Sequence, residues 1–436
     1  MQHRSLMGEI DLACGAGKRT LRLPRGRFAG FLEPKTAVPS ASSEELLRES
    51  LAHPIGSRPL HEIARGKKTA AILIPGKTRR AAAHAYVPAL VAELNAAGLA
   101  DENITAYLAD GTHEQHFESD LIELLGGKMA SRIRCRGHDC RDHEALCHVG
   151  TTRSGTPVWI NRDVLQADVR VLTGRIVPHY FAGWSGGRKA LIPGVAGCET
   201  ITANHRLTLD PVQGIHPEVG PCSLAENPVH QDMLEGARMV GPEFCLNTIL
   251  DADHRMVAAV AGDFVAAHEM GCRLSEEMLR IRVAEPVDLV VTSAGGLPYD
   301  VNFMQALKAV FNVQTIVRPG GAILWLAECA GGIHPGFLRW GRVKPDRELD
   351  AAVRADYDLT GHNSIMLRQL VRRAEIGLVS ALPPDVVTGL GLQPLACIEE
   401  GIRWILGRFP GDFTYLVVPH ASVICAELAS PSRVRS

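Results

Sequence analysis

Short apolar runs along the chain alternate with segments in which apolar residues recur every three or four positions. Thr69–Ile74 reads as a buried strand, and Val87–Leu99 as a helix with Pro88 in its first turn. The next predicted elements are a strand over Ile104–Ala109, a helix over Ser119–Leu125 and a strand over Val169–Thr173. This alternation favours an α/β fold, in which helices cover the faces of a parallel or mixed sheet.

A second unit of the same kind begins near residue 285. Its predicted elements are the strands Val287–Thr292, Gly321–Ala327 and Tyr415–Val418 and the helices Asn302–Val313 and Cys397–Leu406. Pro211–Pro228, rich in Pro and Gly, is predicted to be a long ordered loop. We therefore expect two α/β domains with an active-site cleft between them: an N-terminal domain over residues 1–280, rejoined by residues 408–436, and a C-terminal domain over residues 281–407.

The length and the net charge of the chain limit the kinds of partner it can have. Its 436 residues exceed what one core usually serves, which agrees with two domains. Lys and Arg (46 residues) nearly balance Asp and Glu (48), so there is no basic field to hold a nucleic acid. No run of about 18 apolar residues occurs, and the N-terminus lacks the apolar stretch of a secretory signal. We expect neither a nucleic-acid partner nor insertion in a membrane.

The cysteines indicate a reducing compartment. Eleven are scattered singly, without a Cys-x-x-Cys pair, as is usual for reduced, buried thiols. Three of them lie close to histidines in the segment 135–148, but their spacings fit no compact zinc pattern. A cytoplasmic location is therefore predicted, whereas the oligomeric state stays open, a homodimer included.

Two polar loops follow predicted strands at their carboxyl ends, where sheets of this class bind ligands. Pro75–Arg80 (PGKTRR) could hold a phosphate or carboxylate, or could be a solvated turn with surface arginines. Asp110–His113 (DGTH) places a histidine beyond a glycine turn, which suits acid–base chemistry because an imidazole titrates near neutrality. Taken alone, one of 18 histidines is more often structural.

The densest group of polar residues follows the strand Val169–Thr173. Glycines at 183, 186 and 187 allow backbone N–H groups to approach an anion closely. The other polar residues of this segment include His179, Ser185, Lys189 and His205. The segment matches neither a Walker loop nor a Gly-x-Gly-x-x-Gly fingerprint, so an ordinary nucleotide site is not supported.

A fourth segment lies in the second unit, where a predicted helix carries Gln305 and Lys308. These residues are three apart and therefore share one face of the helix. Lys308 stands among apolar residues, where an unpaired ammonium would be costly. It either reaches solvent along its stem or meets an anion in the cleft.

Together these segments resemble the nickel-dependent lactate racemase family. The stretch PHYFAGWSGGRKALIPG (178–194) and the following TITANH (200–205) are similar to the signature of that family. The GTH at 111–113, the TR at 78–79 and the QALK at 305–308 occur in the same order and at similar spacing. The resemblance spans both predicted domains.

The resemblance implies a racemase or epimerase of 2-hydroxy acids that uses a nickel-pincer nucleotide. This cofactor is a pyridinium mononucleotide whose two sulfur-bearing arms hold the metal. Lys189 matches the lysine that carries it covalently, and His205 matches the histidine that completes the nickel coordination. His113 and His179 match the acid–base pair. In the family mechanism one histidine takes the hydroxyl proton while the α-hydrogen leaves as hydride, and the resulting 2-keto acid takes the hydride back on its opposite face.

Other positions are assigned to cofactor and substrate. Cofactor contacts are predicted at Thr78, Ser185, Gly186 and Gly187. Substrate contacts are predicted at Arg79, Arg80, Gln305 and Lys308. Imidazole is a good nickel ligand, and cationic side chains suit a substrate carboxylate. The resemblance also implies that the enzymes of cofactor biosynthesis are needed as partners for loading.

Three positions depart from the family pattern. Gly76 stands where the family usually has Asp, Arg80 where it often has Pro, and Met304 where a Tyr precedes the Gln. The loss of an acid and the gain of Arg80 predict a substrate larger or more anionic than lactate, such as a dicarboxylic or sugar-derived hydroxy acid.

Three other functions were weighed for this sequence. An NAD-dependent hydroxy-acid dehydrogenase would need the glycine fingerprint that is missing here. A non-catalytic relative that only binds the nucleotide would not need the pair His113 and His179. A zinc hydrolase built on His179 and His205 would lack the usual zinc motif.

Overall fold

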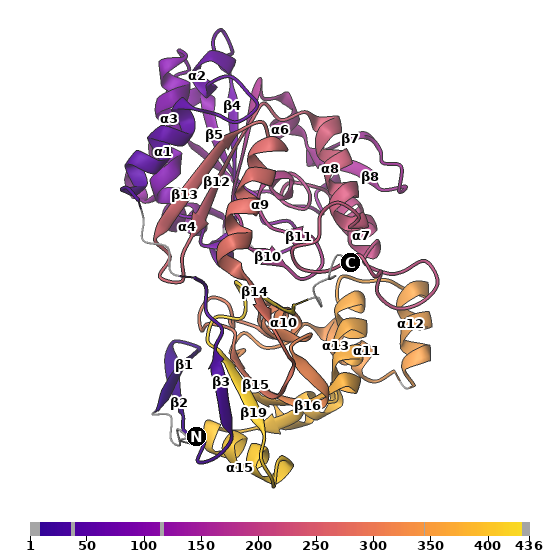
Figure 1. Ribbon diagram of the computed structural model, residues 1–436. Coiled ribbons are helices and arrows are strands. Elements are labelled where there is room, and N and C mark those ends of the chain that lie inside the picture. Colours follow the sequence, from indigo (N-terminus) through magenta and orange to yellow (C-terminus); the bar gives the residue numbers. More distant parts are fainter. Residues whose placement is uncertain (1–8, 36–39, 114–116, 344, 430–436) are drawn as a thin grey trace, which may run out of the picture. The chain divides into compact units, whose positions relative to one another are not determined.

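The computed structural model describes residues 9–35, 40–113, 117–343 and 345–429, which form two compact units (Figure 1). Unit 1 comprises Met1–Pro34, Leu209–Pro217 and Leu279–Ser436, and unit 2 comprises Lys35–Thr208 and Glu218–Met278. Each unit has a sheet of its own with helices around it. The predicted fold class, two α/β units with parallel and mixed sheets, is confirmed.

The sheet of unit 2 has the strand order β13-β12-β9-β4-β5-β6. β12 and β13 are antiparallel, and all other neighbours are parallel. Read from β6, the strands follow one another in the order 3-2-1-4-5-6 of a doubly wound sheet, so the direction of winding reverses between β4 and β9. The strands are β4 (Ala70–Ile74), β5 (Ile104–Leu108), β6 (Arg134–Arg136), β9 (Val169–Arg175), β12 (Phe244–Leu250) and β13 (Met256–Gly262).

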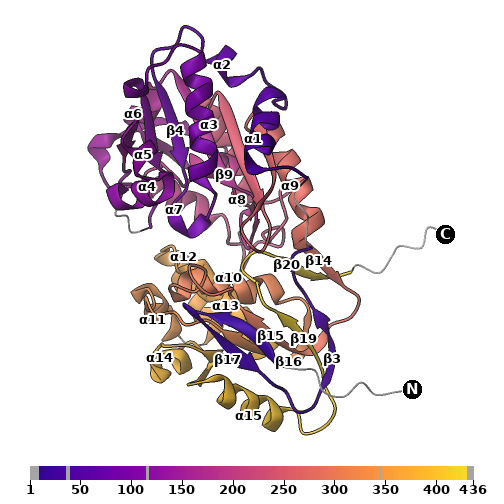
Figure 2. The ribbon, with the colours of Figure 1, turned by 90° about the vertical axis from the view of Figure 1, so that its left-hand side faces the viewer.

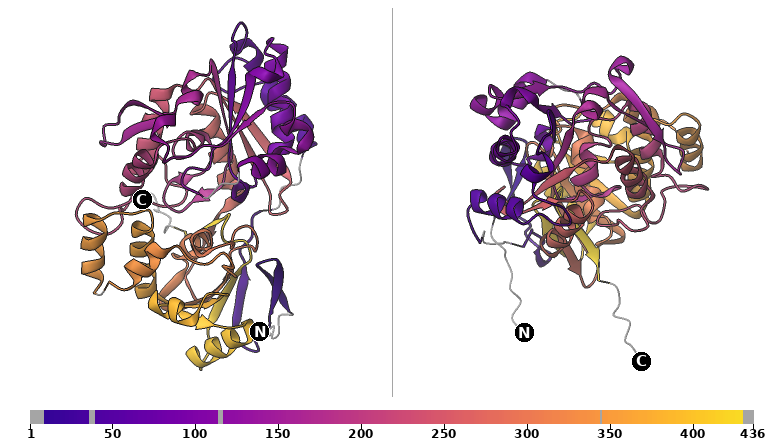
Figure 3. Two further views of the ribbon diagram at one scale, coloured as in Figure 1. Left: turned by 180° about the vertical axis from the view of Figure 1, so that it is seen from behind. Right: turned by 90° about the horizontal axis from the view of Figure 1, so that it is seen from above.

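Unit 2 also contains two short hairpins and nine helices among its described residues. The hairpins are β7 (Leu146–Thr151) with β8 (Pro157–Asn161) and β10 (Pro178–His179) with β11 (Gly183–Trp184). The helices are α1 (Ser43–Ala52), α2 (Leu60–Ile63), α3 (Ala83–Ala96), α4 (Phe117–Leu125), α5 (Gly127–Ala130), α6 (Arg162–Gln166), α7 (Cys198–Arg206), α8 (Pro228–Val240) and α9 (Ala266–Leu279). Helices α1 and α2 each pack against α3, in the indigo and violet part of the ribbon (Figure 3).

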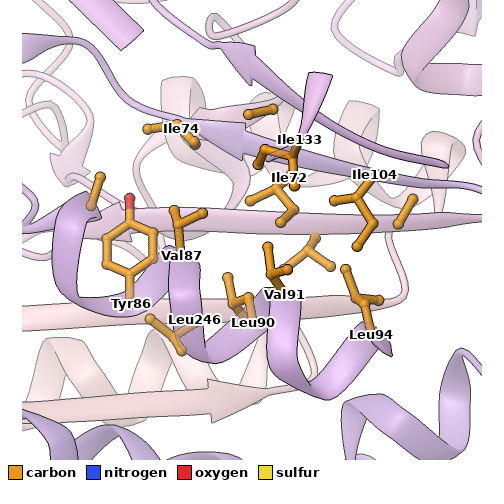
Figure 4. Close-up of a cluster of buried hydrophobic side chains, with 14 of the residues drawn as sticks. Ile72, Ile74, Tyr86, Val87, Leu90, Val91, Leu94, Ile104, Ile133 and Leu246 are labelled. Atoms are coloured by element: carbon orange, nitrogen blue, oxygen red, sulfur yellow. The ribbon is translucent and has the colours of Figure 1, made fainter. Parts of the chain in front are cut away.

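Helix α3 supplies much of the core of unit 2 (Figure 4). Its apolar residues recur at helical spacing, so they form one stripe along the helix. The fully buried members of the stripe are Tyr86, Val87, Leu90, Val91 and Leu94. They pack with Ile72 and Ile74 of β4, a strand that is apolar at every position, as expected for a strand that is covered on both sides.

Helix α3 begins earlier than predicted, at Ala83, so Pro88 lies inside the helix and not in its first turn. Because proline has no N–H, the carbonyl of His84 lacks its usual helical donor. The start of the helix carries no recognisable signal, since Ala82 stands at the N-cap with φ 61° and no side-chain cap. The prediction of the helix start was therefore wrong.

The sheet of unit 1 has the order β18-β17-β16-β15-β19-β3, and all its neighbours are parallel. Figure 2 shows β3 (Arg27–Phe31), from the N-terminal part of the chain, beside β19 (Thr414–Val418). The other strands are β15 (Val287–Ser293), β16 (Val317–Leu326), β17 (Ala374–Val379) and β18 (Gln393–Leu395).

Further elements complete unit 1. The two-stranded pairs are β1 (Ile10–Cys14) with β2 (Gly17–Leu21) and β14 (Arg280–Val283) with β20 (Cys425–Leu428). The helices are α10 (Phe303–Val313), α11 (Pro335–Gly341), α12 (Asp346–Ala355), α13 (Gly361–Arg373), α14 (Pro384–Gly389) and α15 (Ile398–Arg408). In the described ranges of the chain, no helix is long and apolar enough to cross a membrane.

The unit boundaries differ from the predicted domains 1–280 and 281–407. Because β3 pairs with β19 and β19 with β15, both ends of the chain belong to unit 1. The described residues 408–429 therefore do not rejoin the N-terminal domain, and the described residues 9–34 are not part of it. Pairing at a sheet edge joins segments that are distant in sequence, which no local pattern reveals. The cleft between the units stays a prediction.

Candidate active site

Three loops of unit 2 meet at one edge of its sheet. β4, β5 and β9 are parallel, so their carboxyl ends lie at the same edge, and residues 75–82, 109–113 and 176–189 follow them. The winding of the sheet reverses between β4 and β9, where doubly wound sheets bind their ligands. The structure thus brings together the three loops of this unit that the sequence analysis singled out.

The ring of Phe181 is the point on which three predicted site residues converge. The ring centroid of His179 lies 4.5 Å from that of Phe181, and the centroid of His205 lies 4.9 Å from it, both edge-on. Lys189 Nζ lies 5.4 Å from the same centroid. Phe181 is 4% exposed and His179 is 7% exposed, so these contacts are largely shielded from water.

Ser185 holds the loop after β9 in shape. Its hydroxyl donates to the carbonyl of Arg175 at 2.6 Å and accepts from the N–H of Val177 at 2.9 Å. Both partners belong to the same loop or to the strand end before it. Ser185 therefore has its donor and an acceptor position engaged within the protein.

The two glycines after Ser185 are required by close packing. The N–H of Gly187 donates to Asn247 Oδ1 at 2.9 Å, and a Cβ on Gly186 would lie 2.6 Å from the same oxygen. A Cβ on Gly187 would lie 2.8 Å from the ring of His268. Ser185, Gly186 and Gly187 therefore shape the loop, and their contacts with a cofactor stay a prediction.

His205 lies in the last turn of α7, and its neighbour Asn204 fixes that helix against α8. Asn204 Nδ2 donates to the carbonyl of Val229 at 3.1 Å and to Asp232 Oδ2 at 2.9 Å. The hydroxyl of Thr152 donates to the other oxygen of Asp232 at 2.5 Å. Since Asn204 and Asp232 are buried, this network determines where α7 presents His205.

His113 lies in the loop after β5, and its side chain is exposed. Its N–H donates to the carbonyl of Asp110 at 3.2 Å. The N–H of Gly111 donates to the carbonyl of Gly194, and the N–H of Gly194 donates to the carbonyl of Lys189, both at 3.0 Å. Backbone hydrogen bonds thus join the loop of His113 to that of Lys189.

The carboxylate of Asp110 fills the space in which a side chain at position 76 would stand. A Cβ on Gly76 would lie 2.1 Å from Asp110 Oδ2. Gly76 has an ordinary extended backbone, with φ −62° and ψ 168°, so a side chain there would meet only the carboxylate of Asp110, which would have to move. An acidic group is therefore present at this strand end, although Gly76 had suggested its loss.

The loop after β4 continues as a 3₁₀ turn over Lys77–Arg79. Lys77 Nζ pairs with Asp120 at 2.8 Å and with Glu123 at 3.1 Å on α4, and these hydrogen bonds raise its pKa. Lys77 therefore anchors the loop to α4. Thr78 Oγ1, in contrast, is buried and finds no hydrogen-bond partner among the described residues.

The two arginines of this loop differ in their surroundings. Arg79 is half-buried, whereas Arg80 is exposed and adopts a left-handed backbone with φ 43°. Such a conformation costs about 1 kcal/mol or more for a residue with a Cβ. It turns the chain sharply between the 3₁₀ turn and α3.

Gln305 and Lys308 lie on α10 in unit 1. The side chain of Asn302 caps this helix by accepting from the N–H of Gln305 at 2.9 Å. Lys308 Nζ donates to Gln305 Oε1 at 2.5 Å, which confirms that the two side chains share one face. Gln305 is buried and Lys308 is half-buried.

Sequence reasoning missed two residues that the structure places in the site. Phe181 was noted only as part of a motif, although its place between His179 and Gly183 could have marked it as a residue of the same loop. Asp110 was passed over beside His113, and only its contact with Gly76 reveals it. In the described part of the chain, no three His, Cys, Asp or Glu side chains gather as a metal site. A metal held by one histidine and by atoms of a cofactor needs no such group.

A doubly wound α/β unit with two histidines and a lysine around one aromatic ring at its switch point has the arrangement of a small-molecule enzyme. Comparison with known proteins is more specific. Residues 14–215 match the family model of the lactate racemase N-terminal domain, and residues 283–424 match that of the lactate racemase C-terminal domain.

Full-length relatives agree with these matches. The lactate racemase of Thermoanaerobacterium thermosaccharolyticum is 33% identical over 431 residues, which cover 97% of this chain and 100% of that protein. The lactate racemase of Lactiplantibacillus plantarum is 29% identical over 424 residues, 95% of this chain and 98% of that protein. The structure of the lactate racemase apoprotein from T. thermosaccharolyticum superposes with a TM-score of 0.86 at 28% identity, covering 96% of this chain and 100% of that one.

The chain belongs to the lactate racemase family. It is a racemase and therefore an isomerase.

Proposed function

We propose that this enzyme inverts the α-carbon of a 2-hydroxy acid and that it does so with a nickel-pincer nucleotide. The observation that carries the proposal is the convergence of His179, Lys189 and His205 on the ring of Phe181. The family resemblance gives each of these three side chains a role in one reaction.

The residues at this edge of the sheet fit such a cofactor. Lys189 would hold it covalently, and His205, an imidazole on a fixed helix, would bind nickel. The buried hydroxyl of Thr78 has no protein partner and would be satisfied by a polar group of the nucleotide. When bound, the cofactor supplies an acceptor for the α-hydrogen as hydride.

His113 and His179 would move the hydroxyl proton, one for each enantiomer. The N–H of Ala182 donates to His179 Nδ1 at 3.4 Å, so the neutral ring of His179 carries its proton on Nε2. As a base, the ring would give up this hydrogen bond and take the hydroxyl proton on Nδ1, and the imidazolium so formed would return that proton to the oxygen of the keto acid. General acid–base catalysis of this kind contributes about 10²- to 10⁴-fold to a rate.

The substrate carboxylate would be held by Arg79, Arg80 and Lys308, with Gln305 as a neutral partner. The presence of Arg80 supports a substrate larger or more anionic than lactate. The argument from a lost acid at position 76 no longer supports it, because Asp110 supplies a carboxylate there.

A hydroxy-acid dehydrogenase that uses NAD is the second candidate, since the strand order of unit 2 is that of dinucleotide-binding domains. In those proteins the first strand is followed by the glycine fingerprint. Here the first strand, β4, is followed by Pro75-Gly76-Lys77-Thr78, a 3₁₀ turn tied to α4. This observation favours the racemase.

A chiral assay of the loaded enzyme tests the proposal. Single enantiomers of lactate, malate and gluconate are incubated with it, and both configurations at the α-carbon are followed. We expect inversion without added NAD, with malate or gluconate preferred to lactate. A preference for lactate would overturn the substrate assignment, and turnover that requires NAD would overturn the reaction.

A further inference from the structure

A cavity of about 300 Å³ lies in unit 1, where α12 packs against α13 (Figure 1). Its volume is at the lower end of the range of small-molecule sites. All of the residues that line it belong to unit 1, and the proposed substrate residues of this unit, Gln305 and Lys308, are not among the described ones. The cavity is therefore distinct from the candidate active site.

Three arginines line this cavity. Arg368 and Arg372 are four residues apart on α13, so they share one face of that helix, and Arg347 comes from the first turn of α12. Arg368 is 9% exposed, and its two Nη atoms each lie 3.5 Å from a carbonyl, those of Val343 and Gly341. A guanidinium has five N–H donors in a planar fork, so an arginine keeps its protein partners and still binds an oxyanion.

The single acidic side chain among the described lining residues is already engaged. Asp350 Oδ2 accepts from Arg354 Nε at 2.8 Å, and Asp350 Oδ1 accepts from the N–H of Gly214 at 2.9 Å. Arg354 does not line the cavity, so it neutralises this carboxylate from behind the wall. The lining residues thus supply three guanidiniums against one carboxylate that has its own counter-ion.

The rest of the wall is held in place by the protein itself. The segment Leu209–Pro217 contributes part of it, and both members of the ion pair just described bond to Gly214 of this segment. Leu209 packs in one apolar cluster with Leu349 and Ile365, and the latter two also line the cavity. The cavity is therefore formed in the absence of a ligand, and it offers an apolar surface beside its arginines.

We propose that this cavity binds a small organic anion that carries at least two carboxylate or phosphate groups. The fork of an arginine matches such an oxyanion through two parallel hydrogen bonds. Three guanidiniums on two helices suit more than one anionic group, and the apolar side chains of Leu349 and Ile365 suit a carbon skeleton between these groups. The side-chain amides of Gln213 and Gln369 add neutral donors and acceptors for a hydroxyl of the ligand. This inference does not rest on the proposed function.

Isothermal titration calorimetry of the full chain, purified without cofactor, tests the proposal. The probes are citrate and 3-phosphoglycerate, with acetate as the reference that carries one carboxylate. The pH and the ionic strength are held constant, because salt screens contacts between charges. We expect citrate or 3-phosphoglycerate to bind about tenfold or more tightly than acetate, and the tighter of the two identifies carboxylate or phosphate as the preferred group.

Two variants locate the binding site. Arg347→Gln and Arg372→Gln each remove an exposed guanidinium, so we expect both proteins to fold. Each should weaken the binding of the preferred probe about tenfold, because hydrogen bonds to a charged group are lost. Arg403→Gln is the matched control, since Arg403 is an exposed arginine on α15 that does not line the cavity, and it should leave the affinity unchanged.

Arg79→Gln separates this cavity from the candidate active site, because it removes a proposed substrate contact in unit 2. Binding of the preferred probe should persist in this variant. Equal affinities for acetate and for both larger anions would overturn the proposal. Binding that depends on Arg79 and not on Arg347 or Arg372 would overturn it as well. The titration measures no turnover, so its failure leaves the proposed function standing.

Discussion

The ring of Phe181 contacts three residues of the proposed site, although it is itself chemically unreactive. It is in contact with His179, His205 and Lys189, which come from β10, α7 and the turn after β11. Edge-on aromatic contacts and a cation above a ring each contribute about 0.5–1.5 kcal/mol and, more importantly, fix angles between the groups. Phe181 therefore determines how the three side chains face one another.

Replacing Phe181 with Leu should impair the reaction more than the fold. The change keeps an apolar side chain of similar volume, so we expect a loss of about 1 kcal/mol in the free energy of unfolding. The contacts with the three polar groups are lost, and kcat of the loaded enzyme should fall about tenfold or more. The matched control is Phe244→Leu in the core of unit 2, since Phe244 is fully buried and packs in a different cluster. Equal kcat values in the two variants would contradict this role of Phe181.

At the scale of single residues, the sequence predicts best where the polar residues are close along the chain. His179, Lys189 and His205 were singled out because polar residues are dense in one segment; the structure places all three around Phe181, and their roles stay a prediction. The packing role of Gly186 and Gly187 was not predicted, because the residues they pack against lie far along the chain. Asn247 is 60 residues from Gly187, and no motif foretells that contact.

At the level of elements, α7 carries His205 in a direction set by its packing on α8. Asn204 makes the connection through Val229 and Asp232. In the proposed nickel site this contact lies one residue away from the ligand His205, and the loss of such supporting contacts commonly changes metal affinity by about 10- to 100-fold.

Asn204→Ala should therefore weaken nickel retention. We expect a loss of about 1–3 kcal/mol in stability, because buried Asp232 loses a donor, and nickel retention after dialysis against a chelator about tenfold lower than in the unchanged enzyme. Asn95→Ala is the matched control, since Asn95 Nδ2 also bonds a carbonyl (Leu99, 2.8 Å) and a carboxylate (Asp101, 3.0 Å), between α3 and the turn after it. If both variants retain nickel equally, α7 is not held by Asn204.

Strands and helices with strong periodicity were predicted correctly, and irregular ones were not. The strand predicted over Thr69–Ile74 is β4, and the helix predicted over Asn302–Val313 is α10, each within one residue at either end. The hairpin β1–β2, by contrast, was not predicted, because β2 (GKRTL) is mostly exposed and shows no apolar alternation. Its stability comes from pairing with β1 and not from its own pattern.

For the whole molecule, the assignment of the chain ends was the main error. The sheet of unit 1 needs β3 from the start of the chain and β19 from its end. Both strands are short, and β3 is the edge strand with β19 beside it. Which strand each of them pairs with is determined by the free edge of the sheet and cannot be predicted from the residues of the strand itself. A division by sequence order could not have found this arrangement.

Acid should destabilise the protein through histidines that are buried and uncharged. Burial lowers the pKa of His230 to about 2 and those of His268 and His362 to about 3, whereas an unfolded histidine titrates near 6.5. Below pH ~6.5 the unfolded chain binds more protons than the folded one, so stability falls as the pH falls, by about 1.4 kcal/mol per pH unit for each histidine.

Urea unfolding at pH values from 7.5 to 4.5 checks this expectation. His362→Gln removes one titrating group while glutamine can still bond the hydroxyl of Tyr357, 2.8 Å from His362 Nδ1. The free energy of unfolding of this variant should depend less steeply on pH, by about 1.4 kcal/mol per unit. An identical slope in both proteins would show that His362 is not held uncharged.

The most direct test of the account is peptide mass mapping across Lys189, with nickel analysis, on protein co-produced with the cofactor's biosynthetic enzymes. We expect the mass of a nucleotide on the Lys189 peptide together with bound nickel, no added mass in Lys189→Ala, and the added mass without nickel in His205→Ala. An unmodified Lys189 without nickel, under conditions that load the L. plantarum lactate racemase, would contradict the assignment of this site.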